Sequence, residues 1–374
     1  MDAAPDAVAA GEVSTRRDAV RALAAALYAG GSMALLARCA APRAAVTVYT
    51  SADDVLAREV FAACTRATGV TVAPVFDTEA TKTTGLENRL RSESDRPRAD
   101  LFWSSESFAV ARLAAAGVLA ELPEALWGSW PEAHRDAARR WLGFAARARV
   151  VAHRSDAAPI REWTELADPA LARGSRAAVA IADPRFGTTS AHLSALRVAW
   201  GAARAQGVAA PTCEEWLSAL RARECLVLPG GNAATVDAVA AGECAYGLTD
   251  TDDVLAAIGR GLPLAFSLPR TLPEDNAGGG TMVVPNTIAM VSGGPGDRLA
   301  AELVAAYLVS PECEMLIARS PSRNLPLGPE VDRADRASMP FAEPDPMRFD
   351  AAEAARDGAA FSVRAHELLT RGAR

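Results

Sequence analysis

Acidic residues follow the ends of several predicted strands, and their oxygens could hold a cation. These residues are Asp53, Asp77, Glu79, Glu106, Asp250, Asp252 and Asp253. Carboxylates that converge without arginine partners, as we expect here, repel one another, and a bound cation relieves that repulsion. Oxygen ligands suit hard cations such as ferric iron, manganese, calcium or magnesium. Some of these acids have another explanation, because Asp53 and Asp252 stand just before apolar-periodic segments, at helix N-cap positions.

A second set of residues offers hydrogen-bond donors. Thr188 and Thr189 open a predicted helix directly after an apolar strand, and Asn232 opens another helix. Hydroxyls and free N–H groups at such helix starts bind phosphate or phosphonate groups. Lys82, the only lysine in the chain, could add a positive charge. The hydroxyls could also act only as helix caps, and Lys82 could be an ordinary solvated side chain.

These residues can meet only if parallel strands bring them to one edge. Apolar runs predict strands over residues 46–50, 70–76, 99–103, 144–153, 177–182, 245–249 and 281–291, and helical patterns separate most of them. This alternation is typical of an α/β fold, in which ligands bind beyond the carboxyl ends of the strands. Pro74 favours an edge or bent position for its strand. We expect 144–153 and 281–291 to cross between two lobes.

Composition narrows the classes of function. The 374 residues are half hydrophobic, which suffices for two domains, and the net charge of -7 argues against nucleic acids and anionic membranes as partners. Catalytic signatures are missing: there is no H-E-x-x-H pair, no G-x-S-x-G elbow and no phosphate-binding G-x-x-x-x-G-K-[ST] loop. We therefore expect a binding protein and no catalytic residues.

The N-terminal segment has the pattern of an export signal. Arg16 and Arg17 precede an uncharged stretch from Ala22 to Ala37, which resembles a twin-arginine signal. This pattern predicts a periplasmic or other extracytoplasmic location. Lipid attachment at Cys39 and cleavage near residue 41 are the two alternatives for its processing. Further along, Cys213 and Cys225 are the one close cysteine pair to test for a disulfide.

Six stretches carry a resemblance to a known family. They are VTVYTSADD from Val46, VFDTEATKTTGLENRL from Val75, ADLFWSSE from Ala99, AIADPRFGTTSAH from Ala180, AAGECAYGLTDTDDVLAA from Ala240 and VVPNTIAMVSGG from Val283. In these stretches the chain is similar to extracellular solute-binding proteins of ATP-binding-cassette importers. Within that family it resembles the ferric-iron/thiamine/phosphonate-like group, which has the type II periplasmic binding fold. The resemblance implies two α/β lobes, each a mostly parallel sheet flanked by helices, that close on a ligand by hinge motion. It also implies delivery of that ligand to a membrane permease.

One departure from this family concerns iron. Ferric-iron binders of the group use an adjacent tyrosine pair, and counting from Gly242-Glu243 that pair falls on Asp252 and Asp253 here. Tyr246 lies inside the preceding predicted strand and is a poor substitute. Phenolate ligation in the usual manner is therefore not expected.

The resulting expectations are specific. We expect residues 1–41 to be the export signal, 42–142 with 281–345 to form lobe 1, 143–280 to form lobe 2, and 346–374 to form a C-terminal helical segment. The expected ligand is ferric iron or another hard cation, carried as cargo by a monomer without an intrinsic cofactor. Its predicted metal ligands are Glu106, Asp252 and Asp253, and the other predicted contacts are Ser51, Asp53, Asp77, Glu79, Lys82, Ser105, Thr188, Thr189 and Asn232. The alternative ligand is a small phosphorylated, phosphonate or zwitterionic solute, and an enzyme or sensor on the same fold is a third interpretation.

Overall fold

The computed structural model describes residues 45–77, 84–171, 177–185, 187–341 and 343–370. The expected export signal with Cys39, and the predicted contacts Glu79 and Lys82, lie outside these residues. In the part that is described, no helix is both long enough and apolar enough to cross a membrane. Cys213 and Cys225 are both free thiols, so the close pair does not form a disulfide.

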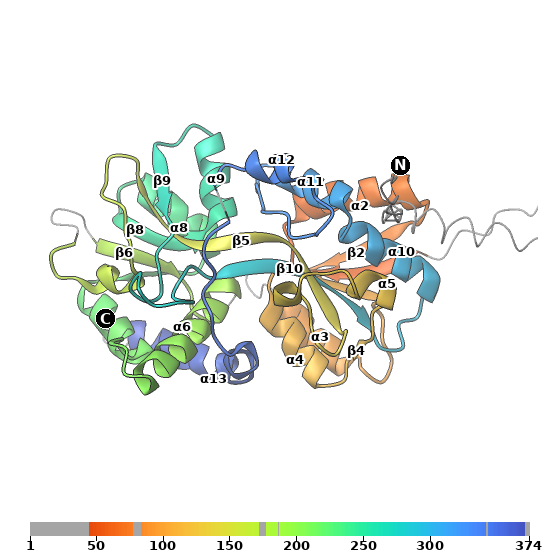
Figure 1. The fold of residues 1–374 in the computed structure, drawn as a ribbon, viewed down its shortest axis with the longest axis horizontal. Helices are drawn as coiled ribbons and strands as arrows, with labels where there is room; N and C mark the ends of the chain where they lie inside the picture. Colours follow the sequence, from red (N-terminus) through yellow and green to blue (C-terminus); the bar gives the residue numbers. More distant parts are fainter. Residues whose placement is uncertain (1–44, 78–83, 172–176, 186, 342, 371–374) are drawn as a thin grey trace, which may run out of the picture. The chain divides into compact units, whose positions relative to one another are not determined.

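The strands form one mixed sheet in the order β2-β1-β3-β10-β5-β8-β6-β7, with β4 on β10 and β9 on β5. Their bounds are β1 Val46–Thr50, β2 Val72–Phe76, β3 Leu101–Ser104, β4 Leu119–Ala120, β5 Trp141–Arg154, β6 Ala177–Ala182, β7 Leu226–Leu228, β8 Cys244–Asp250, β9 Leu264–Ser267 and β10 Val283–Val291. The strands β2, β1 and β3 are parallel, and so are β7, β6 and β8. Each parallel group is the centre of one lobe (Figure 1).

Two strands connect the lobes. The first half of β5 pairs with β10, and its second half, from Arg149 onwards, pairs with β8 and β9. The strand β10 also pairs with β3 in lobe 1. The predicted crossing strands are therefore β5 and β10, as Figure 1 shows in its centre. Pro74 lies in β2, which is an edge strand of the sheet, as its missing N–H donor predicts.

Helices cover both faces of each parallel group. Their bounds are α2 Asp54–Thr68, α3 Thr84–Ser92, α4 Ser107–Ala115, α5 Glu124–Trp127, α6 Gly187–Ala205, α7 Cys213–Ala222, α8 Gly231–Ala240, α9 Thr251–Gly259, α10 Arg298–Leu308, α11 Pro311–Arg319, α12 Arg333–Ala337 and α13 Ala351–Thr370. Strands buried on both faces need apolar side chains throughout, which explains the unbroken run AAVAIA of β6.

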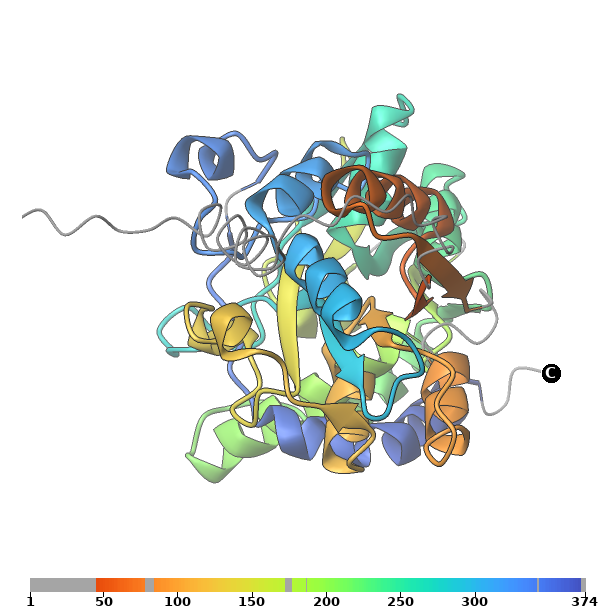
Figure 2. The ribbon, with the colours of Figure 1, turned by 90° about the vertical axis from the view of Figure 1, so that its right-hand side faces the viewer.

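Separate hydrophobic clusters fill the space between sheet and helices. In lobe 1 one cluster joins β1 and β3 to α2, α10 and α11, and Figure 2 shows α2 beside α10. A second cluster lies on the opposite face, against α3 and α4. In lobe 2 the two faces are packed by α6, α7 and α13 and by α8 and α9. The C-terminal helix α13 also packs on α4, so it contacts both lobes.

Candidate functional site

The strand ends of lobe 1 carry hydroxyls and carboxylates. The hydroxyl of Ser51 accepts the N–H of Ser105 at 2.9 Å and lies 3.2 Å from the Ser105 hydroxyl, so the loops after β1 and β3 are joined. Asp53 is the N-cap of α2, where its carboxylate accepts two backbone N–H groups. Asp77, after β2, accepts the N–H of Leu86 at 3.2 Å.

Glu106 caps a helix as well. It lies at the N-cap of α4, is 4% exposed, and accepts the N–H groups of Phe108 and Ala109. Burial raises the pKa of the Glu106 carboxyl above its usual value, although nearby Arg112 and the two N–H donors act in the opposite direction. Both carboxylate oxygens of this predicted metal ligand are therefore already occupied by local hydrogen bonds.

The strand ends of lobe 2 form a buried polar network around Asp250. One oxygen of Asp250 accepts from Arg149 at 2.7 Å. The other accepts from the Thr188 hydroxyl at 2.6 Å, the Asn232 amide at 2.8 Å and Arg147 Nε at 3.1 Å. Burial alone would raise the pKa of the Asp250 carboxyl, but the two arginines and Thr188 outweigh it and lower the pKa. The network thus joins the first turns of α6 and α8 to the end of β8.

Arg147 and Arg149 are the residues that sequence reasoning missed. The expectation that the acids lack arginine partners is wrong for Asp250, which binds both. Arg149 is fully buried and Arg147 is 6% exposed, and both lie on the crossing strand β5. The signal was present in the sequence, because two charges spaced two apart within an apolar strand must be paired once they are buried.

Two further acids stand beside this network on the first turn of α9. Carboxylate oxygens of Asp250, Asp252 and Asp253 lie within 4.8 Å of one another. An oxygen of Asp252 is also 3.7 Å from Arg147 Nε, and Asp252 and Asp253 are both partly exposed. The structure therefore brings Thr188, Asn232 and these acids together. Thr189, the next residue of α6, is buried.

Some buried nitrogen atoms of the site have no hydrogen-bond partner among the described residues. The Nε and Nη2 atoms of Arg149 lack a hydrogen bond, and so do both ring nitrogens of His192. The His192 ring is fully buried and packs on Trp163, with ring centroids 4.3 Å apart. Burial lowers the pKa of His192 well below its usual value, and the charge of Arg149 lowers it further. A neutral imidazole, and a guanidinium with N–H groups that lack acceptors, thus lie beneath the strand ends.

Arg147 also connects the two lobes. Its Nη2 donates to the carbonyl oxygen of Ser105, in the loop after β3, at 2.5 Å. Nearby, a cavity of about 20 Å³ lies between Glu106 and Arg112 on one side and Gly187, Ser190 and Gly358 on the other. This volume suits about one water molecule, so the facing surfaces are close together in this structure.

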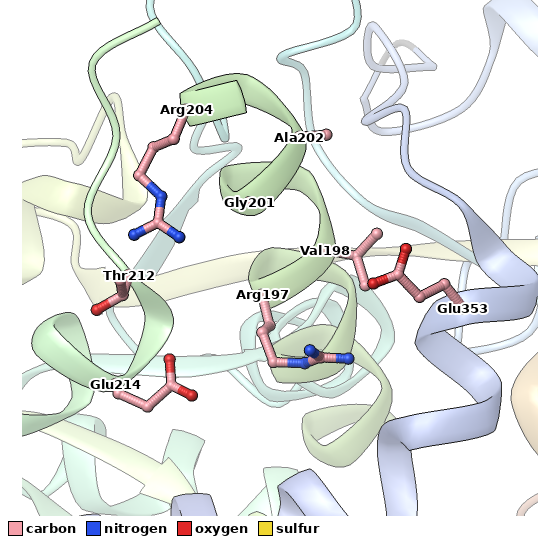
Figure 3. A pocket seen from close by; sticks show the side chains of 8 residues that line it. All are labelled: Arg197, Val198, Gly201, Ala202, Arg204, Thr212, Glu214 and Glu353. Atoms are coloured by element: carbon pink, nitrogen blue, oxygen red, sulfur yellow. The ribbon is translucent and has the colours of Figure 1, made fainter. Parts of the chain in front are cut away.

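A larger hollow lies elsewhere and does not belong to the strand ends. It has a volume of about 600 Å³ and is lined by residues of α6 and α7, by Thr212 and by Glu353 (Figure 3). Arg197 and Arg204 line it together with Glu214, so its charges are mixed. None of the residues that line it takes part in the Asp250 network, which we regard as the functional site.

The described tyrosines have their contacts outside the network. The hydroxyl of Tyr49 donates to Glu93 and that of Tyr246 to the carbonyl of Ala158, while Tyr307 is buried in the cluster of α10 and α11. Among the described hydrogen bonds, none joins a tyrosine to Asp250, Asp252 or Asp253. The described part of the site therefore offers carboxylates, hydroxyls, an amide and guanidinium groups.

Comparison with known proteins agrees with this geometry. Residues 44–320 match the family of bacterial extracellular solute-binding proteins. No curated protein matches the chain by sequence. The chain belongs to this family and is a solute-binding component of an ATP-binding-cassette importer, as the resemblance of its motifs implied.

Solved structures of the same fold include binding proteins for different solutes. Iron-bound HitA from Pseudomonas aeruginosa shares 20% identity over 86% of this chain and 99% of its own, with a TM-score of 0.69. The ferric binding protein from Campylobacter jejuni shares 17% identity over 87% and 99%, with a TM-score of 0.71. AfuA from Actinobacillus pleuropneumoniae, with fructose-6-phosphate bound, shares 14% identity over 87% and 97%, with a TM-score of 0.67. At these identities the likeness establishes the two-lobed periplasmic-binding fold.

Proposed function

We propose that this protein captures a small organic anion or zwitterion between the strand ends of its two lobes and delivers it to a membrane permease. Closure of the lobes around the solute shifts the open–closed equilibrium by the difference in affinity between the two forms. The protein acts outside the cytoplasm as a monomer and performs no catalysis. Export by residues 1–41, with cleavage near residue 41 or lipid attachment at Cys39, belongs to the same proposal, as do the lobe boundaries predicted above.

One observation carries the proposed ligand class: Arg149 is fully buried and keeps Nε and Nη2 without a described partner. A guanidinium group binds a carboxylate or phosphonate through two parallel N–H bonds, and an unpaired buried donor is costly. An anionic group of the solute satisfies these donors. Thr188 and Asn232 add a hydroxyl and an amide next to it.

The partly exposed acids form the part of the site that suits the cationic end of a solute. Asp252 and Asp253 offer carboxylates beside Arg147, and they suit an ammonium group or hydroxyls of the same solute. From the facing loops of lobe 1, Ser51 and Ser105 supply hydroxyls. A solute with one anionic and one cationic end thus matches the arrangement of charges.

Ferric iron or another hard cation is the second candidate, held by Asp252, Asp253 and Glu106. Oxygens of Asp250, Asp252 and Asp253 within 4.8 Å of one another favour it, and several of the similar structures are iron-binding proteins by name. Against it, both oxygens of Asp250 already accept hydrogen bonds from four groups, and Glu106 caps α4. A trivalent cation would have to displace these donors.

Native mass spectrometry with elemental analysis separates the candidates, using protein exported and purified without chelators. The variants are Arg149→Met and the double change of Asp252 and Asp253 to Ala, with Arg154→Met as an exposed control on the same strand. We expect an organic adduct in the wild type and in the control, and its loss in Arg149→Met. A stoichiometric metal that disappears only in the acidic double variant would overturn the proposal in favour of a cation. If the protein is empty, calorimetric titration with 2-aminoethylphosphonate and with ferric citrate makes the same distinction.

A further inference from the structure

The crossing strand β5 contains one extra residue, Ala145. Across the strand pair, Phe144 lies opposite Asn286 and Ala146 lies opposite Pro285, so Ala145 has no partner of its own. Its φ is 42°, in the left-handed region that side chains with a Cβ rarely adopt. Such a bulge bends a strand and changes which residues share a face. A strained bulge persists only when its surroundings hold it in place.

Three side chains hold the backbone of Ala145. Its N–H donates to Oε1 of Glu314 at 2.9 Å. Its carbonyl oxygen accepts from the amides of Asn286 at 2.6 Å and Asn324 at 3.1 Å. These side chains come from α11, from the second crossing strand β10 and from the loop after α11, and Trp103 in turn donates to Asn286 at 3.1 Å. We call Glu314, Asn286 and Asn324 the bulge clamp.

Glu314 is the centre of the clamp. It is fully buried, and its carboxylate also accepts the N–H groups of Leu327 at 2.8 Å and Gly328 at 2.6 Å. A Cβ at residue 328 would collide with Oε2 of Glu314, so a larger residue there has to push the carboxylate aside. A buried carboxylate that binds three backbone N–H groups from two separate segments ties the loop 327–328 to the crossing strand. No part of the solute site itself is used for this purpose.

The bulge determines where the two arginines point. Phe144 and Ala145 are adjacent, yet both belong to the same hydrophobic cluster of lobe 1. Beyond the bulge, Ala148 and the alternate residues after it pack into the core against α8 and α9, so Arg147 and Arg149 take the opposite face, toward Asp250. Because side chains alternate along a strand, loss of the extra residue would exchange these two faces.

We propose that the bulge clamp, with Glu314 at its centre, is a positioning device that aims Arg147 and Arg149 at the solute site. Its importance for binding rests on the proposed function, in which those arginines belong to the site that binds the solute. Glu314 touches no solute and acts through Ala145. Glu314→Gln places an amide N–H₂ where two oxygens now accept three N–H groups, so at least one N–H loses its acceptor.

The test uses arginine-selective modification by phenylglyoxal, read by peptide mass spectrometry on the full chain. In the wild type, Arg147 and Arg149 are protected by burial. In Glu314→Gln, and independently in Gly328→Ala, we expect modification of both arginines to accelerate about tenfold or more, the loss of a charged hydrogen bond setting this scale. Glu312→Gln, an exposed neighbour on the same helix, is the matched control and should leave the rate unchanged.

Buried thiols distinguish positioning from general loosening. Cys64 in α2 and Cys213 in α7 are inaccessible in the native protein and should stay unreactive to N-ethylmaleimide in every variant. Unchanged arginine protection in both clamp variants would overturn the proposal, and so would thiols that become reactive together with the arginines. If the arginines are released but Arg149→Met leaves solute binding intact, the clamp stands and the proposed solute chemistry fails.

Discussion

The acids at the strand ends of the two lobes stand at similar positions in the sequence but make different hydrogen bonds. In lobe 1, Asp53 and Glu106 cap the helices that follow them, and their carboxylates are satisfied by backbone N–H groups. In lobe 2, Asp250 stands at the same kind of position before α9, but its side chain makes no cap hydrogen bond. It binds two buried arginines, a threonine and an asparagine instead.

The difference shows what decides the role of a carboxylate after a strand. A capping acid needs only its own helix, so the position is fixed by a few residues of sequence. Asp250 needs donors from β5, α6 and α8, which come together only in the folded lobe. The lobe 1 acids are therefore helix caps, and the lobe 2 acid organises the charges of the proposed solute site.

The largest expected effect comes from removing Asp250. Asp250→Ala leaves Arg147 and Arg149 buried without their shared carboxylate, which should lower the free energy of unfolding by about 3–5 kcal/mol. Asp252→Ala, two residues further along the chain and partly exposed, should cost about 0.5 kcal/mol. Urea unfolding followed by circular dichroism measures both. Equal losses in the two variants would mean that Asp250 has no special structural role.

A second prediction concerns pH and the neutral ring beneath the network. His192 faces the charges of Arg149 and Asp250, and its folded-state pKa lies well below the usual value of 6.5. Below pH 6.5 His192 binds a proton in the unfolded chain but not in the folded protein. The free energy of unfolding therefore falls with decreasing pH by about 1.4 kcal/mol per pH unit. Above pH 6.5 this contribution is constant.

His192→Phe should remove that slope while keeping an aromatic ring against Trp163. The measurement is urea unfolding of both proteins at pH 5.0, 6.0 and 7.5. The other histidines contribute equally to the two proteins, so the difference isolates His192. Parallel stability curves for wild type and variant would show that the folded protein protonates the ring as readily as the unfolded chain does, and the network would then carry a further charge at low pH.

The sequence predicts the elements better than it predicts the site. The run AAVAIA forms β6 over the predicted residues, because a strand buried on both faces has a local signature. The strand predicted over 144–153 is longer, Trp141–Arg154, since pairing with β10 extends it beyond its apolar pattern. Local helix-start patterns predict Thr188 and Asn232 as site residues, and the fold brings both to Asp250.

The arginines could not be assigned from composition. Nearly every basic residue in the chain is arginine, so the type alone says little about Arg147 or Arg149. Their role depends on the bulge at Ala145, which shifts the alternation of side chains along β5 by one residue. Glu314 holds this bulge, and it lies in a helix about 170 positions later in the chain. The spacing of the two arginines in an apolar strand thus predicts that they are paired, but a contact at that sequence separation leaves no local pattern that shows which face they take.

A smaller effect than that of Asp250→Ala tests the lobe 1 side of the comparison. Asp53→Ala removes the acceptor for the N–H groups of Val55 and Leu56 and should lower the free energy of unfolding by about 1 kcal/mol. Asp53→Ser restores a capping oxygen without the charge, so it should recover most of that stability. Solute affinity, measured by calorimetry, should be the same in Asp53→Ser and the wild type. A lower affinity in Asp53→Ser would show that this carboxylate contacts the solute as well, and both lobes would then supply the solute contacts that we propose for Asp250 and its neighbours.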